Sequence, residues 1–357
     1  GNTLRVGVFG ESHGRAIGVT VQNLPAGEQI DLLALEAFLD RRKPGKNALS
    51  TARHEPDRPV FLSGLLEGKI TGSPLCAIIE NQDARSRDYA ELLDKPRPGH
   101  ADYTAYLKWA GQADMRGGGH FSGRIPAPLT VAGSIARQVL SAKGIHIGAH
   151  VTRIAGIEDR RFDPLGESEA TFASLREEKL PVLTKDIGEK MEAAILAAKA
   201  EGDSVGGIVE CMVTGLPVGL GDPFFDSLES ELSHMMFSIP AVKGIEFGDG
   251  FGLAAMKGSA ANDGMHWAEG KVETKTNHNG GILGGISGGN PVVFRLAIKP
   301  TASIGKPQLT VNLAERKDTL LTIGGRHDPC IIPRAIPVIE TAAALVILDE
   351  ILVTSDW

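Results

Sequence analysis

The chain contains two similar strings, Val21-Gln22-Asn23-Leu24-Pro25-Ala26-Gly27 and Val213-Thr214-Gly215-Leu216-Pro217-Val218-Gly219. In both places the residues before the string predict a β-strand. An acidic residue able to cap a helix follows each string, as Asp31 does before Leu32. The two stretches therefore predict one strand–loop–helix unit used twice, either through an ancient duplication or by coincidence.

Outward from these strings, strands and helices are expected to alternate along the chain. Short apolar runs predict strands, and longer runs with a helical period predict helices. The predicted strands are 4–9 (buried), 74–80, 145–151 (half-buried), 205–214 and 291–298. One predicted helix begins after Asp31, and the others span 102–109, 130–142, 184–201, 225–237 and 335–352. No low-complexity linker divides residues 1–357, so we expect a single α+β domain of layered sheets and helices.

Composition excludes several classes of protein. The formal net charge is −7, whereas proteins that bind nucleic acid or a membrane surface need a dominant basic face. Cys76, Cys211 and Cys330 are isolated and odd in number, which indicates a reducing compartment and no structural zinc or other metal site. With no secretory leader and no unbroken apolar run of membrane-spanning length, we expect a cytoplasmic location.

Four of the ten histidines lie in glycine-rich strings, around His13, His100, His120 and His327. Glycine allows sharp turns and close approach of the backbone to a ligand. Histidine changes charge near neutral pH, and the arginines in or beside three of these strings suit phosphate and carboxylate oxygens. This combination predicts an enzyme that transfers protons on a phosphorylated substrate.

The first string, Gly10-Glu11-Ser12-His13-Gly14, leaves two alternatives open. It matches the Gly-x-Ser-x-Gly nucleophile elbow, which would make Ser12 the nucleophile of a serine hydrolase. Only nine residues precede Gly10, too few for the strands and the oxyanion loop that an elbow needs. A tight turn in which Ser12 and His13 bond to nearby backbone explains the string equally well.

A second glycine loop, Gly117-Gly118-Gly119-His120-Phe121-Ser122-Gly123-Arg124, comes directly before a predicted helix. Backbone amides of such a loop, together with the positive end of a helix, form a cradle for an anion. The loop is neither a Walker sequence nor a dinucleotide-binding fingerprint, and no other convincing nucleotide fingerprint occurs.

In order along the chain, the strings Gly-Glu-Ser-His-Gly, Arg-Arg-Lys-Pro-Gly, Arg-Pro-Gly-His-Ala-Asp, Gly-Gly-Gly-x-x-Ser-x-Arg, Gly-Asp-Gly-Phe, Gly-Gly-Ile-x-Gly-Gly-Ile-Ser, Lys-Pro-Thr and Gly-Arg-His-Asp-Pro-Cys resemble the chorismate synthase family over residues 10–330. The resemblance implies a lyase of the shikimate pathway of aromatic amino-acid biosynthesis. That enzyme eliminates phosphate from 5-enolpyruvylshikimate 3-phosphate to give chorismate and requires reduced FMN. It further implies a β-α-β sandwich-type fold and a homotetramer.

The resemblance also implies roles for individual residues. His13, His100 and Asp328 match the family's catalytic positions, and Ser12, Arg42, Lys46, Arg124 and Arg326 match substrate-binding positions. The positions that match flavin contacts are His120, Phe121, Ser122, Pro240, Ala241, Gly284, Lys299, Pro300, Thr301, Ala302, Ser303 and Arg326.

Several positions depart from the family's usual pattern. His120, Phe121 and Ile125 stand where Arg, Ser and Glu are common, Pro240 replaces Asn, and Ala48 replaces an arginine near Lys46. A non-catalytic relative that binds flavin or a metabolite is therefore the alternative. Because no nucleotide fingerprint is present, we expect NADPH only as a reductant of FMN, or an external flavin reductase as a partner.

Overall fold

The computed structural model describes residues 1–45, 49, 55–82, 94–324 and 327–354. Its first sheet is antiparallel with the strand order β1-β2-β6-β3. The strands are β1 (Arg5–Gly10), β2 (Ala16–Gln22), β3 (Pro59–Ser63) and β6 (Leu75–Glu80). Helix α1 (Leu32–Asp40) connects β2 to β3, and the Asp31 carboxylate caps it by accepting from Leu33 N and Ala34 N, as predicted.

The second sheet has the order β10-β15-β9-β7-β8 and is also antiparallel. Its strands are β7 (His146–Ile154), β8 (Ile157–Glu158), β9 (Gly207–Thr214), β10 (Val242–Phe247) and β15 (Val292–Ile298). Helix α6 (Leu228–Phe237) connects β9 to β10 as α1 connects β2 to β3. The acidic cap predicted here is wrong, because the Ser227 hydroxyl accepts from Ser230 N.

The two sheets therefore repeat one topology. The order β1-β2-β6-β3 corresponds to β7-β9-β15-β10, with a helix after the second strand and another after the fourth. The paired strings at 21–27 and 213–219 lie where β2 and β9 end, so the repeated strand–loop–helix unit is present.

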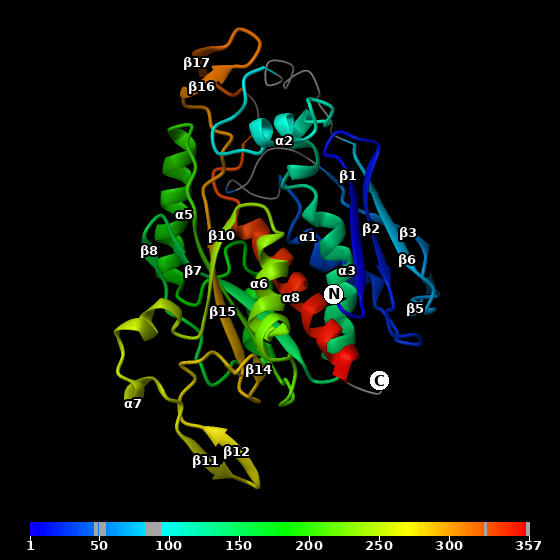
Figure 1. Ribbon diagram of the computed structural model, residues 1–357, viewed down its shortest axis with the longest axis vertical. Helices are drawn as coiled ribbons and strands as arrows, with labels where there is room; N and C mark the ends of the chain where they lie inside the picture. The colour runs from blue at the N-terminus through cyan, green and yellow to red at the C-terminus, as the bar shows by residue number, and fades with distance from the viewer. Residues whose placement is uncertain (46–48, 50–54, 83–93, 325–326, 355–357) are drawn as a thin grey trace.

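Helices α3 (Pro126–Ser141) and α8 (Ile332–Thr354) lie side by side between the sheets (Figure 1). Helix α3 contacts β2 and β6, and α8 contacts β7 and β9. A Cβ on Gly133 would lie 2.3 Å from the Thr341 carbonyl oxygen, so only glycine permits this close helix crossing. Apolar residues of both sheets and both helices form one hydrophobic cluster.

The remaining elements are shorter. They are β4 (Leu65–Leu66), β5 (Lys69–Ile70), α2 (Asp102–Lys108), η2 (Arg116–Phe121), α4 (Glu169–Glu177), α5 (Lys185–Ala200), η3 (Phe224–Asp226), η4 (Gly250–Ala255), α7 (Gly258–Ala261), β11 (Met265–Ala268), β12 (Lys271–Thr274), β13 (Ile282–Leu283), β14 (Ile286–Ser287), β16 (Gln308–Asn312) and β17 (Lys317–Leu321). Within the described ranges, no helix has the length and apolar character to span a membrane.

The mixed helix and strand content is confirmed, but two burial predictions are wrong. β1 is an edge strand whose alternate residues are exposed, so it is not a buried strand. β7 is almost wholly buried rather than half-buried, because the segment that contains α4 covers its outer face.

Candidate functional site

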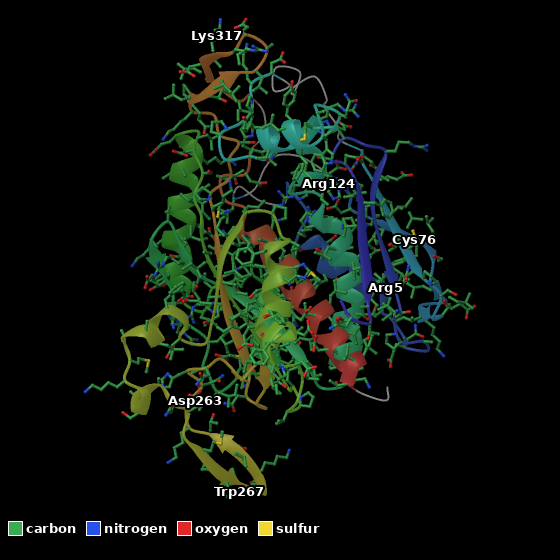
Figure 2. The ribbon with its side chains drawn as sticks, viewed as in Figure 1. Arg5, Cys76, Arg124, Asp263, Trp267 and Lys317 are labelled. Carbon is green, nitrogen blue, oxygen red and sulfur yellow. The ribbon has the colours of Figure 1, made fainter. Side chains whose placement is uncertain are left out.

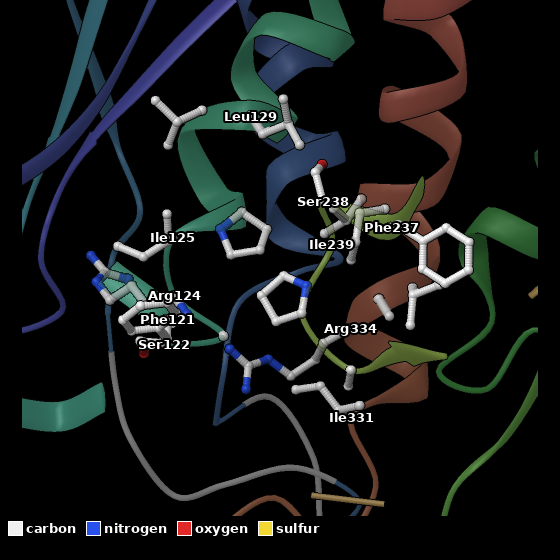
Figure 3. A pocket seen from close by; sticks show the side chains of 18 of the residues that line it. Phe121, Ser122, Arg124, Ile125, Leu129, Phe237, Ser238, Ile239, Ile331 and Arg334 are labelled. Carbon is white, nitrogen blue, oxygen red and sulfur yellow. Dashed lines mark hydrogen bonds between the residues drawn. The ribbon is translucent and has the colours of Figure 1, made fainter. Parts of the chain in front are cut away.

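A cavity of about 970 Å³ is lined by residues of β1, β10 and helices α3, α6 and α8 together with the segments that connect such elements around 42–44, 97–101, 117–125, 238–241, 299–303 and 327–331 (Figure 3). It contains most of the predicted site residues. Those in its wall are Arg42, His100, His120, Phe121, Ser122, Arg124, Pro240, Ala241, Lys299, Pro300, Thr301, Ala302, Ser303 and Asp328. Residues far apart in the sequence thus meet around one space.

Two buried arginines of this wall share one carboxylate. Arg42 Nη1 donates to Asp57 Oδ2 at 3.0 Å, and Arg124 Nη1 donates to Asp57 Oδ1. Burial lowers the pKa of Arg42 to about 9, because a guanidinium charge is costly to desolvate. Burial alone would raise the pKa of Asp57, but the charges of Arg42 and Arg124 hold it below its ordinary value. Asp57 is therefore ionised and fixes both guanidinium groups.

The Arg42 side chain also supports the loop that leads into α3. Its Nη2 donates to the carbonyl oxygens of Gly123 at 2.6 Å and of Arg124 at 3.2 Å. Arg124 Nε donates to Asn81 Oδ1 at 2.6 Å, and its Nη2 lies 3.5 Å from Glu55 Oε2. These contacts hold the two guanidinium groups in one geometry.

A third arginine connects this wall to Asp328. Arg334, in the first turn of α8, donates from Nη1 to Asp328 Oδ2 and from Nε to the Arg42 carbonyl oxygen at 3.1 Å. Figure 3 shows its guanidinium reaching across the cavity toward the side formed by Phe121 and Arg124. Asp328 is thereby held as a carboxylate at the cavity wall, beside a cation that also contacts the Arg42 backbone.

His100 is oriented by a carboxylate of its own loop. Asp102 Oδ1 lies 2.7 Å from His100 Nδ1. The Asp102 carboxylate also accepts hydrogen bonds from Arg97 Nε and Nη2, each at 2.7 Å. Burial would raise the pKa of Asp102, but the hydrogen bonds from Arg97 and His100 keep it well below the usual range. Arg97 Nη2 also lies 3.1 Å from His100 Nδ1, so the ring is held from its Nδ1 side between a guanidinium and a carboxylate, and Nε2 is its other nitrogen.

The string Arg97-Pro98-Gly99-His100-Ala101-Asp102 leads into a helix and predicts that Asp102 caps it, but the structure differs. Ala101 is the N-cap residue and makes no side-chain cap hydrogen bond, while Asp102 lies in the first turn. Its carboxylate is already occupied by Arg97 and His100. This carboxylate therefore serves the site rather than the helix terminus.

The glycine loop places His13 behind the cavity wall. Gly117, Gly118 and Gly119 have φ angles of 63°, 91° and 55°, and a Cβ on Gly117 would lie 2.4 Å from the His13 ring. Only glycine allows this approach. His13 itself is buried and does not line the cavity, whereas Gly117 does. Gly14 N–H donates to Glu11 O at 3.0 Å, which closes a tight turn, and Ser12 N–H donates to Gly119 O at 3.1 Å. Ser12 is 0% exposed and is therefore not an exposed nucleophile.

The residues 120 and 121, which depart from the family pattern, have defined structural roles. His120 Nδ1 donates to the Gly10 carbonyl oxygen at 2.8 Å, which ties the glycine loop to the end of β1. The Phe121 ring lies 5.8 Å from the Trp109 ring. Both residues still line the cavity.

A second group of cations lies across the cavity, at 299–303 and at the start of β10. Burial and the nearby Lys243 charge both lower the pKa of Lys299, and its Nζ donates to the Gly99 carbonyl oxygen. Arg97 Nη1 donates to Ser303 Oγ at 3.2 Å. Thr301 Oγ1 is buried with no hydrogen-bond partner in the described part of the chain. An unpartnered hydroxyl in the same cavity-lining segment as Lys299 is a group that an anionic oxygen would satisfy.

Besides the buried Ser12 and His13, three more predicted residues are not among those that line the cavity. Gly284 is in the β13–β14 hairpin, and it is not one of the described residues that line the cavity. Lys46 and Arg326 lie outside the described residues. Conversely, sequence reasoning did not single out Asp57, Arg97, Arg334 or Lys243. Only Arg97 carried a signal, because it belongs to the string that contains His100.

The family model described as chorismate synthase matches residues 4–352. The chain belongs to the chorismate synthase family. It is 45% identical to the chorismate synthase of Pyrococcus abyssi, over 100% of this chain and 98% of that protein. It is 46% identical to that of Methanosarcina barkeri, over 99% of this chain and 95% of that protein.

A crystal structure of chorismate synthase superposes with a TM-score of 0.76 at 27% identity, covering 98% of this chain and 91% of that one. Family membership confirms the predicted enzyme class, a lyase that converts 5-enolpyruvylshikimate 3-phosphate to chorismate. The substrate of the chorismate synthase family is a phosphorylated small molecule, and arginines are suited to phosphate and carboxylate oxygens.

Proposed function

We propose that the cavity binds reduced FMN and 5-enolpyruvylshikimate 3-phosphate side by side, and that this chain eliminates phosphate between them. The observation that carries the proposal is the fixed pair of buried arginines on Asp57, facing a space that also contains His100 and Asp328. Positive charge, a proton-transfer group and a carboxylate base thus surround one cavity.

The residues across from the arginines fit the flavin. An FMN phosphate would give Thr301 Oγ1 its missing partner and offset the adjacent charges of Lys299 and Lys243. The cavity of about 970 Å³ has the size of a site for a cofactor-sized ligand. When bound, reduced flavin supplies transient electron density to the elimination, and the protein supplies placement and electrostatics.

The arginines contribute in different ways. Arg42 is 1% exposed and its guanidinium is engaged by Asp57 and two carbonyl oxygens, so it acts as a positioning residue for Arg124. Arg124 and Arg334 face the cavity more directly and would attract the carboxylates and phosphate of the substrate. Ser12, Lys46 and Arg326 remain proposed substrate contacts.

Proton transfer is assigned to two histidines. The Asp102 carboxylate and the Arg97 guanidinium orient the His100 ring from its Nδ1 side, so we assign proton transfer to His100 Nε2. His13, against Gly117, would protonate the departing phosphate, which leaves more easily as the acid. Asp328, held by Arg334, would take up the ring proton.

Replacing each proton-transfer residue tests these roles. We expect His13→Ala and His100→Ala to lower phosphate release by about 10²–10⁴-fold. Flavin fluorescence titration should show bound FMN in both variants. Arg116→Ala serves as the control, since the exposed Arg116 pairs only with Asp114 among the described residues and should leave turnover unchanged. Near-parental turnover of either histidine variant removes that residue from the mechanism.

The alternative of a non-catalytic relative makes a different prediction. It requires tight binding of flavin and substrate with no turnover under any reductant.

We further propose that residues 1–357 act as a single domain that arose by internal duplication, that the chain assembles as a homotetramer, and that an external reductase or NADPH supplies reduced FMN. Comparing turnover with and without NADPH separates the two sources.

A further inference from the structure

Three arginines outside the catalytic cavity come together where α1, α3 and α4 approach β7. They are Arg41, which directly follows α1, Arg137 on α3 and Arg176 on α4, and none of them lines the cavity. The guanidinium carbons of Arg41 and Arg137 lie 4.8 Å and 4.5 Å from the centre of the same Phe38 ring. Figure 2 labels Arg124 near the start of α3, and Arg137 lies about 16 Å along that helix from its first residue, at about 1.5 Å per residue. This arginine cluster is therefore separate from the arginines of the cavity wall.

Two carboxylates in the arginine cluster are each taken by one of the arginines. Glu340 on α8 is buried and pairs with Arg41. Glu169, at the start of α4, accepts from Arg176 Nη1 at 2.7 Å. Arg176 Nη2 donates in turn to the Ile147 carbonyl oxygen of β7, also at 2.7 Å. These contacts hold Arg41 and Arg176 in place and use the two negative charges that the cluster contains.

Arg137 has no counter-charge of its own. It forms no hydrogen bond or ion pair with another described residue, and its Nε is buried without a partner. Arg41 Nη2 and Arg176 Nε are also buried and unpartnered within the described part of the chain. Burial lowers the pKa of Arg137 to about 10, and the charge of Arg176 acts in the same direction. The charges of Glu340 and Glu169 offset these effects only in part, so the cluster of three cations and two anions keeps a surplus positive charge.

We propose that the arginine cluster of Arg41, Arg137 and Arg176 is a second anion site, which binds a phosphate group as free phosphate or as part of a metabolite. The planar guanidinium groups suit phosphate because their edges donate paired hydrogen bonds to its oxygens. Such an anion gives acceptors to unpartnered nitrogens and cancels the surplus charge. Solvent reaches the site, since the side chains of Arg41 and Arg176 are 14% and 13% exposed and Arg137 is half-buried. The Lys43–Asp40 ion pair beside Arg41 adds no net charge.

The first test is equilibrium dialysis of radiolabelled inorganic phosphate against parent and Arg137→Gln at constant ionic strength. We expect the variant to lose one phosphate site of the parent, with binding there weakened about tenfold or more, the effect of one hydrogen bond to a charged group. Arg160→Gln is the matched control, since Arg160 is exposed, and should bind phosphate like the parent. The catalytic cavity is unchanged in all three proteins, so phosphate held there contributes equally. Equal phosphate binding by Arg137→Gln and parent overturns the proposal.

The second test uses the parent sequence and does not depend on a variant folding. Phenylglyoxal attacks the neutral guanidine, whose fraction is increased by the lowered pKa of Arg137, and peptide mass spectrometry measures the modification at each arginine. We expect inorganic phosphate to slow modification of Arg137 at least threefold relative to chloride at equal ionic strength, with Arg160 unaffected.

A parallel reaction with glycerol 3-phosphate distinguishes the two sources of the phosphate group. Protection of Arg137 by inorganic phosphate alone identifies a site for the free anion, and protection by glycerol 3-phosphate identifies a site for a phosphorylated metabolite. Equal modification of Arg137 with and without either compound overturns the proposal. Neither test measures catalysis, so this site can fail while the proposed function stands.

Discussion

Replacing Asp57 with Asn tests the arginine wall on which the site is built. The side chain keeps its shape, but the carboxylate between Arg42 and Arg124 becomes an amide. The amide oxygen can accept from only one guanidinium, and its NH₂ group faces the other. Removing one member of a buried ion pair costs about 3–5 kcal/mol, because the remaining charge is uncompensated. Glu55 Oε2 still lies 3.5 Å from Arg124 Nη2 and partly compensates its charge, so we expect the free energy of unfolding to fall by about 3 kcal/mol, the lower end of this range.

Urea unfolding of parent and variant measures this loss, with its pH dependence as a second signature. The pKa of Asp57 is lowered in the folded protein, so its stabilisation is complete above the unfolded value of about 3.9 and declines as pH falls through the folded value. The difference between parent and Asp57→Asn should be constant from about pH 6 to 8 and shrink below about pH 4.

A surface ion pair provides the control. Glu36 pairs with Arg58 where both side chains are exposed, so Glu36→Gln should cost at most about 1 kcal/mol. If Asp57→Asn costs no more than Glu36→Gln, the carboxylate does not hold the two arginines and the account of the wall is wrong.

Three further predictions concern other parts of the molecule. Asp102→Asn should lower phosphate release by about 10²-fold or more with flavin affinity unchanged, because the His100 ring loses the carboxylate that orients it. Rates equal to the parent's refute this. Thr301→Val should weaken FMN binding about tenfold in fluorescence titration, because it removes about one hydrogen bond to a charged group. Thr310→Val is the control, since Thr310 is not among the residues that line the cavity. Burial and the charges of Glu231 and Asp349 raise the pKa of Glu350 to about 7, so the folded protein loses stability as pH rises from about 4.5 to 7. In urea unfolding, Glu350→Gln should therefore raise the free energy of unfolding by about 1–2 kcal/mol at pH 8 and leave it unchanged near pH 4.5. An equal increase at both pH values would show that ionisation of Glu350 is not the cause.

Local patterns in the sequence predicted the parts of the fold that local physics controls. The Asp31 cap, the strand at 74–80 and the helix at 184–201 follow from capping and hydrophobic period, and the structure has them within a few residues. The buried face of β7 could not be predicted, because its cover comes from the segment around Phe172, after the strand has ended.

The site residues also fall into those that the sequence reveals and those that only the fold reveals. His100 and Arg124 stand in glycine strings that reveal them in the sequence. Asp57 and Arg334 do not, since a lone acidic or basic residue gains its meaning only when the fold brings it to a partner far along the chain. Asp102 shows the converse error: capping was the local prediction, and a tertiary contact with Arg97 prevailed.

The central claim is that one cavity brings reduced flavin and the phosphorylated substrate together for elimination. Its most direct test is phosphate release from 5-enolpyruvylshikimate 3-phosphate under anaerobic conditions, with reduced FMN, with oxidised FMN and with none. We predict many turnovers with reduced FMN, with phosphate and chorismate formed in equal amounts, and none in the other two reactions. Turnover without flavin, or no turnover with any reductant, would contradict the account.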